Sequence, residues 1–311
     1  MSDIENRLIR FNEPKDEVIK SDPIRLLRAI RLASSLNFKI ESESKDAILR
    51  NYKEINKVSK ERIMKEMYEF IVNKDSSSYI DEYYLLFSEL IKELKDMDGF
   101  MQNNRYHVYD VKDHTLKVLE SIEKRTPILC ISALFHDLGK PAAYFLDENG
   151  VGHFHGHALI SADLATKYLN EFCLPKKDVE RIVKLVKYHD YPVDTKSQVK
   201  KLMSKIGKDL IEDMFVLKRA DIMGQNPSKE YICRLDTFEE KERWVREIIE
   251  SEDALSIKDL KIDGNDLKDT FKFKGEEIGF ILHTLFKLVM DEKLINERDI
   301  LLDYVKRNFV K

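Results

Sequence analysis

The residues most suited to chemistry in this chain are His136 and Asp137, which stand together in the stretch ALFHDLGKP, Ala133–Pro141. The apolar residues before the pair and the Gly-Lys-Pro after it predict a helix that ends at the pair. Neutral imidazole and ionised carboxylate are ligands that divalent metals take up from water. Because both side chains lie on one turn, we expect a metal site that takes further ligands from elsewhere in the chain.

Further histidines stand at the ends of other predicted helices. His114 lies near the start of one helix, and a turn and a second helix then lead to His136, so two antiparallel helices would bring both histidines to the same end of a bundle. His189 ends a later helix, in register with Ile182 and Leu185 on its apolar side. A buried histidine satisfied by a carbonyl is the alternative for His189, but its position favours a ligand.

Asp221 falls on the apolar face of another predicted helix, in register with Leu210, Met214 and Leu217. A carboxylate on an apolar face is costly unless it is paired or bound to a metal. The pattern therefore favours a ligand over an unpaired buried acid.

A stripe of arginines marks the N-terminal part of the chain. Asp22 as N-cap and Pro23 as first helical residue predict a helix start. Arg25, Arg28 and Arg31 then recur every third residue along one side. They could face phosphates, but periodicity alone favours a solvated face held by salt bridges.

Composition limits the class of protein. The chain has 311 residues, abundant charge, only 10 Gly and 7 Pro, and a net charge of -4. These features favour an all-α fold, and they exclude a global basic field that would draw the chain to nucleic acid. We expect a cytoplasmic protein that needs no membrane, because no signal pattern or membrane-length apolar run appears. The three cysteines are expected to be buried free thiols.

Other segments carry weaker patterns. Residues 1–21 are expected to form a polar lead-in, the serine run after Asp75 a loop, and residues 142–157 another loop that ends at His157. His283 lies inside an apolar helix, so a structural role is expected.

The order of the candidate ligands, His, His-Asp, His, His and Asp, resembles that of the HD superfamily of metal-dependent phosphohydrolases. The Phe-x-Gly-His element of that family selects His157 over His153 and His155. For those two, positions in a loop and contact with substrate remain equal alternatives. The resemblance implies that Asp137 bridges two metals. The first metal would be held by His114, His136, Asp137 and Asp221, and the second by Asp137, His157 and His189.

The same resemblance implies a catalytic role for Asp137 and Lys140. A metal there would activate a water for in-line attack on phosphorus, and Lys140 would meet a phosphate oxygen, unless it only neutralises the helix end. If one metal is bound, His157 and His189 would contact phosphate instead. Such mixed sites accept Mg, Mn, Fe, Co, Ni or Zn.

A second resemblance lies in FNEPKDEVIKSDPIRLLRAIRLASSLNFKIE, continued by KVSKERIMKEM. Both resemble the neck of class II tRNA nucleotidyltransferases, the CCA-adding and poly(A)-adding family, in which a Glu-Asp-x-x-Arg motif selects the nucleotide. Asp22 and Arg25 match that motif, and Ser21 replaces its Glu. The later stretch KIDGNDLKDTFKFKGEEIG resembles the body of the same family.

These resemblances imply three parts: a neck-like RNA- or nucleotide-binding region at 1–98, an HD domain at 99–234 and a helical body at 235–311. The catalytic head of the family, a mixed α/β domain, would precede the neck, so we expect no nucleotidyl transfer from this chain alone.

The leading functional hypothesis is a metal-dependent phosphodiesterase or phosphatase that acts on nucleotides or RNA 3′ ends in tRNA maturation. The alternative is a headless part of a CCA-adding enzyme that binds tRNA, selects the nucleotide and needs a separate head. A third hypothesis is an RNA-binding module with a vestigial site, and the full set of ligands argues against it.

Overall fold

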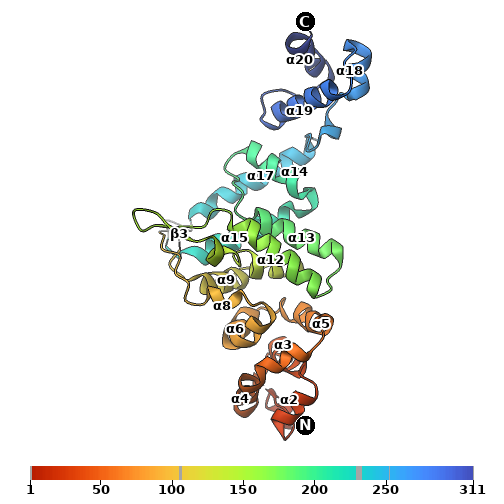
Figure 1. Ribbon diagram of the computed structural model, residues 1–311. Coiled ribbons are helices and arrows are strands. Elements are labelled where there is room, and N and C mark those ends of the chain that lie inside the picture. Colours follow the sequence, from red (N-terminus) through yellow and green to blue (C-terminus); the bar gives the residue numbers. More distant parts are fainter. Residues whose placement is uncertain (1, 105–106, 229–232, 252, 311) are drawn as a thin grey trace. The chain divides into compact units, whose positions relative to one another are not determined.

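The computed structural model is built almost entirely of helices (Figure 1), and it describes every residue except 1, 105–106, 229–232, 252 and 311. The exceptions to helix are two small sheets: β1 (Leu8–Ile9) pairs in parallel with β2 (Lys39–Ile40), and β3 (Phe145–Leu146) pairs antiparallel with β4 (Gly152–His153). The predicted all-α class is confirmed.

The chain forms two compact units. The first contains residues 1–190 and 212–235, and the second contains residues 191–211 and 236–311. The predicted neck, 1–98, thus falls in the first unit, whereas residues 191–211 of the predicted HD domain, 99–234, fall in the second. The three-part division stays a prediction. In the described part of the chain, every helix is too short or too polar to cross a membrane.

The N-terminal helices begin earlier than expected. The predicted lead-in holds two helices and a strand. The serine run opens α6 instead of forming a loop, because Ser76 and Ser77 are buried in the core and Asp75, just before them, accepts a hydrogen bond from the Ser34 hydroxyl. The helices of this part are α1 (Ser2–Glu5), α2 (Lys15–Ser21), α3 (Arg25–Leu36), α4 (Ser42–Asn51), η1 (Tyr52–Lys57), α5 (Lys60–Phe70), α6 (Ser76–Glu82), α7 (Tyr84–Leu90) and α8 (Leu94–Met97).

The predicted helix start at Asp22 is wrong. Asp22 follows the end of α2, and its backbone carbonyl accepts a hydrogen bond from the Arg25 N–H at 3.1 Å. A turn through Pro23 and Ile24 therefore precedes α3, and the Asp22 carboxylate instead pairs with Arg62 at 2.9 Å.

The remaining helices of the first unit carry the candidate ligands. Two of them have side-chain caps, since Asp110 accepts from the Asp113 N–H ahead of α9 and Thr126 accepts from the Leu129 N–H ahead of α10. α10 packs against α9, α12 and α13. These helices are α9 (Val111–Glu120), α10 (Pro127–Phe135), α11 (Lys140–Ala143), α12 (His157–Glu171), α13 (Lys176–Tyr188), α15 (Ile211–Gln225) and η3 (Cys233–Thr237).

The second unit has its own apolar core, to which Ile281, Leu285, Val289, Leu301 and Val305 contribute. Its helices are α14 (Lys196–Ile206), η2 (Lys208–Leu210), α17 (Phe238–Glu250), η4 (Ile257–Asp259), α18 (Gly264–Phe271), α19 (Glu276–Met290) and α20 (Arg298–Phe309).

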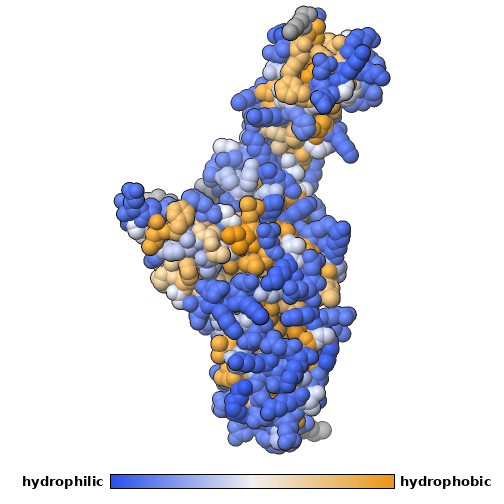
Figure 2. All heavy atoms as spheres, viewed as in Figure 1, coloured by the Kyte–Doolittle hydropathy of each residue, from blue (hydrophilic) through white to orange (hydrophobic). Residues whose placement is uncertain are grey.

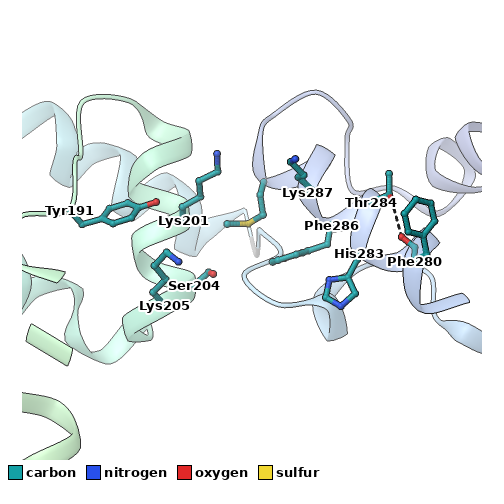
Figure 3. Close-up of a pocket in the computed structure, with 10 residues that line it drawn as sticks. Tyr191, Lys201, Ser204, Lys205, Phe280, His283, Thr284, Phe286 and Lys287 are labelled. Atoms are coloured by element: carbon teal, nitrogen blue, oxygen red, sulfur yellow. Dashed lines mark hydrogen bonds between the residues drawn. The ribbon is translucent and has the colours of Figure 1, made fainter. Parts of the chain in front are cut away.

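The expected structural role of His283 is wrong. The apolar core uses the face of α19 that carries Ile281 and Leu285, and His283 lies on another side of the helix, where it is exposed. It lines a groove of about 550 Å³ between α14 and α19, together with Lys201, Lys205 and other side chains (Figure 3). Burial of the cysteines also differs from expectation: Cys130 is buried, whereas Cys173 and Cys233 are exposed.

Candidate metal centre

Four histidines converge in the first unit from four helices. His114 lies in the first turn of α9, His157 opens α12, and His136 and His189 follow the last residues of α10 and α13. All four are buried. The helix ends predicted from sequence thus bring these side chains together.

Each of these histidines is oriented by a backbone carbonyl. A carbonyl can only accept a hydrogen bond, so each Nδ1 carries the proton and donates it, and the Nε2 of a neutral ring holds a lone pair. The Nδ1–oxygen distances are 3.0 Å for His114 to Gly224, 2.7 Å for His136 to Ala133, 2.8 Å for His157 to Phe154 and 2.7 Å for His189 to Val186.

The Nε2 atoms face one another in two pairs. The Nε2 atoms of His114 and His136 are 3.3 Å apart, and those of His157 and His189 are 3.2 Å apart. Two lone pairs at this distance repel each other, whereas a proton or a metal ion between them satisfies both. Each pair therefore has the arrangement of two ligands of one metal ion.

Asp137 joins the two pairs. Its Oδ2 lies 3.1 Å from His114 Nε2 and 3.0 Å from His136 Nε2. Its Oδ1 lies 3.3 Å from His157 Nε2 and 3.6 Å from His189 Nε2. The carboxylate is 1% exposed, and neither oxygen accepts a hydrogen bond of normal geometry from a described residue. One oxygen thus faces each histidine pair, as a bridging ligand would.

Asp221 approaches the first pair from α15. Its Oδ1 lies 3.1 Å from His114 Nε2 and 3.9 Å from His136 Nε2, and its Oδ2 accepts a hydrogen bond from Gln225 Nε2 at 3.2 Å. Two sets of described residues lie close enough to share a metal ion: His114, His136 and Asp221, and His136, Asp137 and His189.

The electrostatics keep both acids ionised. Burial by itself raises the pKa of Asp137, but His136, Lys140 and His114 outweigh it and hold that pKa well below its usual range. The pKa of Asp221 is also lowered, because His114 more than offsets the effect of burial. Burial lowers the pKa of His114, yet the carboxylates of Asp137 and Asp221, each 3.1 Å from its Nε2, raise that pKa to about 9. When no metal is bound, His114 thus carries a second proton, and its positive charge lies between the carboxylates of Asp137 and Asp221.

Lys140 lies inside the site and not on the surface of a helix end. Its Nζ is 2.7 Å from Asp137 Oδ2 and 2.7 Å from Gln102 Oε1, and it lies 5.3 Å from the centre of the Phe154 ring. Only 5% of the residue is exposed. The Lys140 side-chain nitrogen is therefore fixed beside the Asp137 carboxylate.

A cavity of about 320 Å³ opens onto these groups. Sequence reasoning missed His107, Gln225 and Asp190, which line it beside the predicted residues. Burial and the nearby Lys140 lower the pKa of His107 to about 2, so its ring is neutral. Gln225 could have been found, because it lies one turn after Asp221 on the same helix, whereas His107 stands in an irregular segment that has no periodic signal.

The predicted nucleotide-binding residues lie elsewhere and do not line this cavity. Arg28 and Arg31 pair with Glu66 of α5 at 3.0 and 2.6 Å, so two of the three arginines form the salt-bridged face. Arg25 is partly buried and forms no ion pair with another residue in the described part of the chain. A role of Asp22 and Arg25 in selecting a nucleotide stays a prediction.

Two segments of the chain match known protein families. Residues 105–241 match the HD domain family, and residues 37–97 match the family described as the probable RNA and SrmB-binding site of polymerase A. The chain is 28% identical over 233 residues to the A-adding tRNA nucleotidyltransferase of Deinococcus radiodurans, covering 70% of this chain and 52% of that protein. It is 28% identical over 222 residues to the CC-adding tRNA nucleotidyltransferase of Thermus thermophilus, covering 67% of this chain and 50% of that protein.

A solved structure has a similar fold. The CCA-adding enzyme of Bacillus stearothermophilus, in complex with CTP, aligns over 99% of this chain and 67% of its own, with a TM-score of 0.62 and 18% identity. The chain spans about half the length of the curated relatives it matches.

Residues 105–241, which hold the facing histidine pairs, thus match the HD domain family. The chain carries this domain together with an RNA-binding segment of the polymerase A family, and it is homologous to the CCA-adding tRNA nucleotidyltransferases. The resemblances to these families are confirmed.

Proposed function

We propose that the chain is a metal-dependent phosphohydrolase, a phosphodiesterase or phosphatase of the HD type. It acts on nucleotides or RNA ends in the maturation of the tRNA 3′ end. One observation supports the proposal best: the histidine Nε2 atoms face one another in two pairs, and one oxygen of Asp137 faces each pair.

The donor set fits divalent metal ions. His114, His136, Asp221 and one oxygen of Asp137 would hold one ion, and His157, His189 and the other oxygen of Asp137 would hold a second. Such ions, when bound, polarise a phosphoryl oxygen and lower the pKa of a coordinated water. Nitrogen and carboxylate ligands suit Mn, Fe, Co, Ni or Zn, and Mg less well.

The chain's own residues would bind and orient the phosphate. The Lys140 ammonium borders the cavity. It would pair with a phosphate oxygen, because metal ions held by Asp137 would take up part of the carboxylate charge that Lys140 now faces. The neutral His107 ring donates from Nδ1 to Asn104 Oδ1 at 3.0 Å, so its Nε2, which faces Lys140 Nζ at 3.5 Å, can only accept a hydrogen bond. The cavity, at about 320 Å³, has the size of a small ligand pocket and admits a phosphate with its sugar.

The test is hydrolysis of 2′,3′-cyclic AMP, 2′-AMP and p-nitrophenyl phosphate with Mg, Mn, Ni or Co. Asp137→Asn keeps the shape of the side chain but removes its charge, so metal-dependent turnover should be lost. Asp163→Asn, an exposed change on α12, is the matched control and should behave like the parent. Equal turnover by folded Asp137→Asn and parent would sink the proposal.

A second candidate function is the tRNA-holding part of a CCA-adding enzyme. The match of residues 37–97 to an RNA-binding family supports it. So does the groove of the second unit, whose lining includes Lys201, Lys205 and Lys287 together with the rings of Tyr191 and Phe280 (Figure 3). Under this hypothesis Asp137→Asn would still bind tRNA, and mixing the chain with a separate nucleotidyltransferase head would restore CCA addition. If the variant does not bind tRNA and the mixture does not add CCA, this second function is refuted and the phosphohydrolase remains.

A further inference from the structure

The hairpin of β3 and β4 places its side chains on two distinct faces. Side chains alternate along a strand, so Tyr144, Gly152 and Phe154 point to one face. Phe145, directly paired with His153, points to the other face. Figure 1 shows this hairpin as the yellow-green loop that extends from the helices beside the label β3.

The inner face is fixed to the protein. The Gly152 N–H donates to the Asn103 carbonyl at 2.9 Å, and the Asn103 side chain donates to the Tyr144 hydroxyl at 2.6 Å. A side chain at Gly152 would overlap with the carbonyl oxygen of Gln102. The Phe154 ring lies under Lys140 of the metal site. The hairpin is therefore held against the wall of the cavity.

The outer face carries three aromatic rings. The rings of Phe145 and His153 are nearly parallel, at 21° with centres 5.1 Å apart. The His155 ring lies 5.6 Å from that of His153 and 5.5 Å from that of Phe145. Phe145 is 45% exposed, and hydrophobic side chains are visible on the projecting part of the molecule where the hairpin lies (Figure 2). None of these three described side chains is buried in the apolar core, so core packing does not account for the cluster.

The ring cluster continues into the cavity. His155 belongs to the cluster and also lines the cavity beside His157 and Lys140. A ligand whose phosphate lies at Lys140 would thus meet the aromatic face at the cavity mouth. Aromatic side chains stack on any nucleobase, because every base has a π-face.

We propose that Phe145, His153 and His155 form a stacking platform for the base of a nucleotide whose phosphate occupies the metal cavity. The inference rests on the proposed hydrolysis and names its substrate class: nucleotides or a single-stranded RNA end, in preference to phosphate esters without a base.

The kinetic test compares 2′-AMP with β-glycerol phosphate, a secondary phosphomonoester that has no base. Phe145→Ala should lower the ratio of kcat/KM for 2′-AMP to that for β-glycerol phosphate by about 5- to 150-fold, the range measured for loss of one stacked base. Phe145→Tyr keeps the ring and should keep the ratio. Leu146→Ala is the matched control, since Leu146 is 53% exposed on the same strand but outside the ring cluster. An unchanged ratio in Phe145→Ala would overturn the platform.

A binding measurement separates failure of the platform from failure of the hydrolase. Saturation-transfer NMR of 2′-AMP with the full chain in EDTA requires no turnover. Strong saturation of the adenine protons in the parent and in Leu146→Ala, but not in Phe145→Ala, supports the platform even if no substrate is hydrolysed. Equal saturation in all three proteins, or none in the parent, refutes it.

Discussion

The facing histidines predict that one substitution will have opposite effects with and without metal. In His157→Gln, the side-chain amide can donate to His189 Nε2, which now faces the His157 Nε2 at 3.2 Å. A hydrogen bond to His189 Nε2 would then replace the contact between the two ring nitrogens. In EDTA we therefore expect the variant to equal the parent in stability or to exceed it by about 0.5–1.5 kcal/mol.

With metal the order should reverse. A ligand at 100 times its dissociation constant stabilises the folded state by about 2.7 kcal/mol, and the variant loses that contribution at the second site. For a unit of this size, about 2–4 °C of Tm accompanies each kcal/mol, so the metal-induced rise in Tm should be about 5–10 °C smaller in His157→Gln. The expected metal content falls from two ions per chain to one.

Thermal unfolding in EDTA and in saturating Mn, together with elemental analysis of the dialysed protein, makes the comparison. His155→Gln is the matched control, because His155 is exposed and its ring is not part of either Nε2 pair. The reasoning would be refuted by an equal metal-induced shift in parent and His157→Gln, or by a clear loss of stability of the variant in EDTA.

Three other substitutions test single contacts. Gly139→Ala would put a methyl 2.6 Å from the carbonyl oxygen of His157, so α12 must shift. We expect a loss of about 1–3 kcal/mol in unfolding free energy, measured by urea titration. Metal binding should also weaken, which a metal titration measures. Gln225→Ala removes the hydrogen bond that orients Asp221 and should weaken metal affinity about 10- to 100-fold by calorimetry, while an unchanged affinity would contradict this role. Glu66→Gln breaks the ion pairs to two arginines of α3 and should cost about 1–3 kcal/mol in urea unfolding, with no effect on metal content.

Sequence patterns located the candidate ligands because these residues stand at helix ends. Apolar periodicity marks where each helix ends, so the pattern alone assigns His136 and His189 to helix C-termini and His157 to a helix start, and the three helices have these bounds. The same reasoning failed where a tight turn replaced a cap, as at Asp22, and where one face of an apolar helix stays exposed, as at His283. Local pattern cannot separate these cases, because burial depends on what packs against the helix.

The sequence by itself determined the helical class, the order of the candidate ligands and the family that this order resembles. Only the tertiary structure decided that the Nε2 atoms meet in two pairs, with one oxygen of Asp137 facing each. It also brought Gln102 to Lys140 and turned three rings of the hairpin outward. These arrangements join residues that are far apart in the chain, and distances between such residues follow from helix packing and not from any local periodicity.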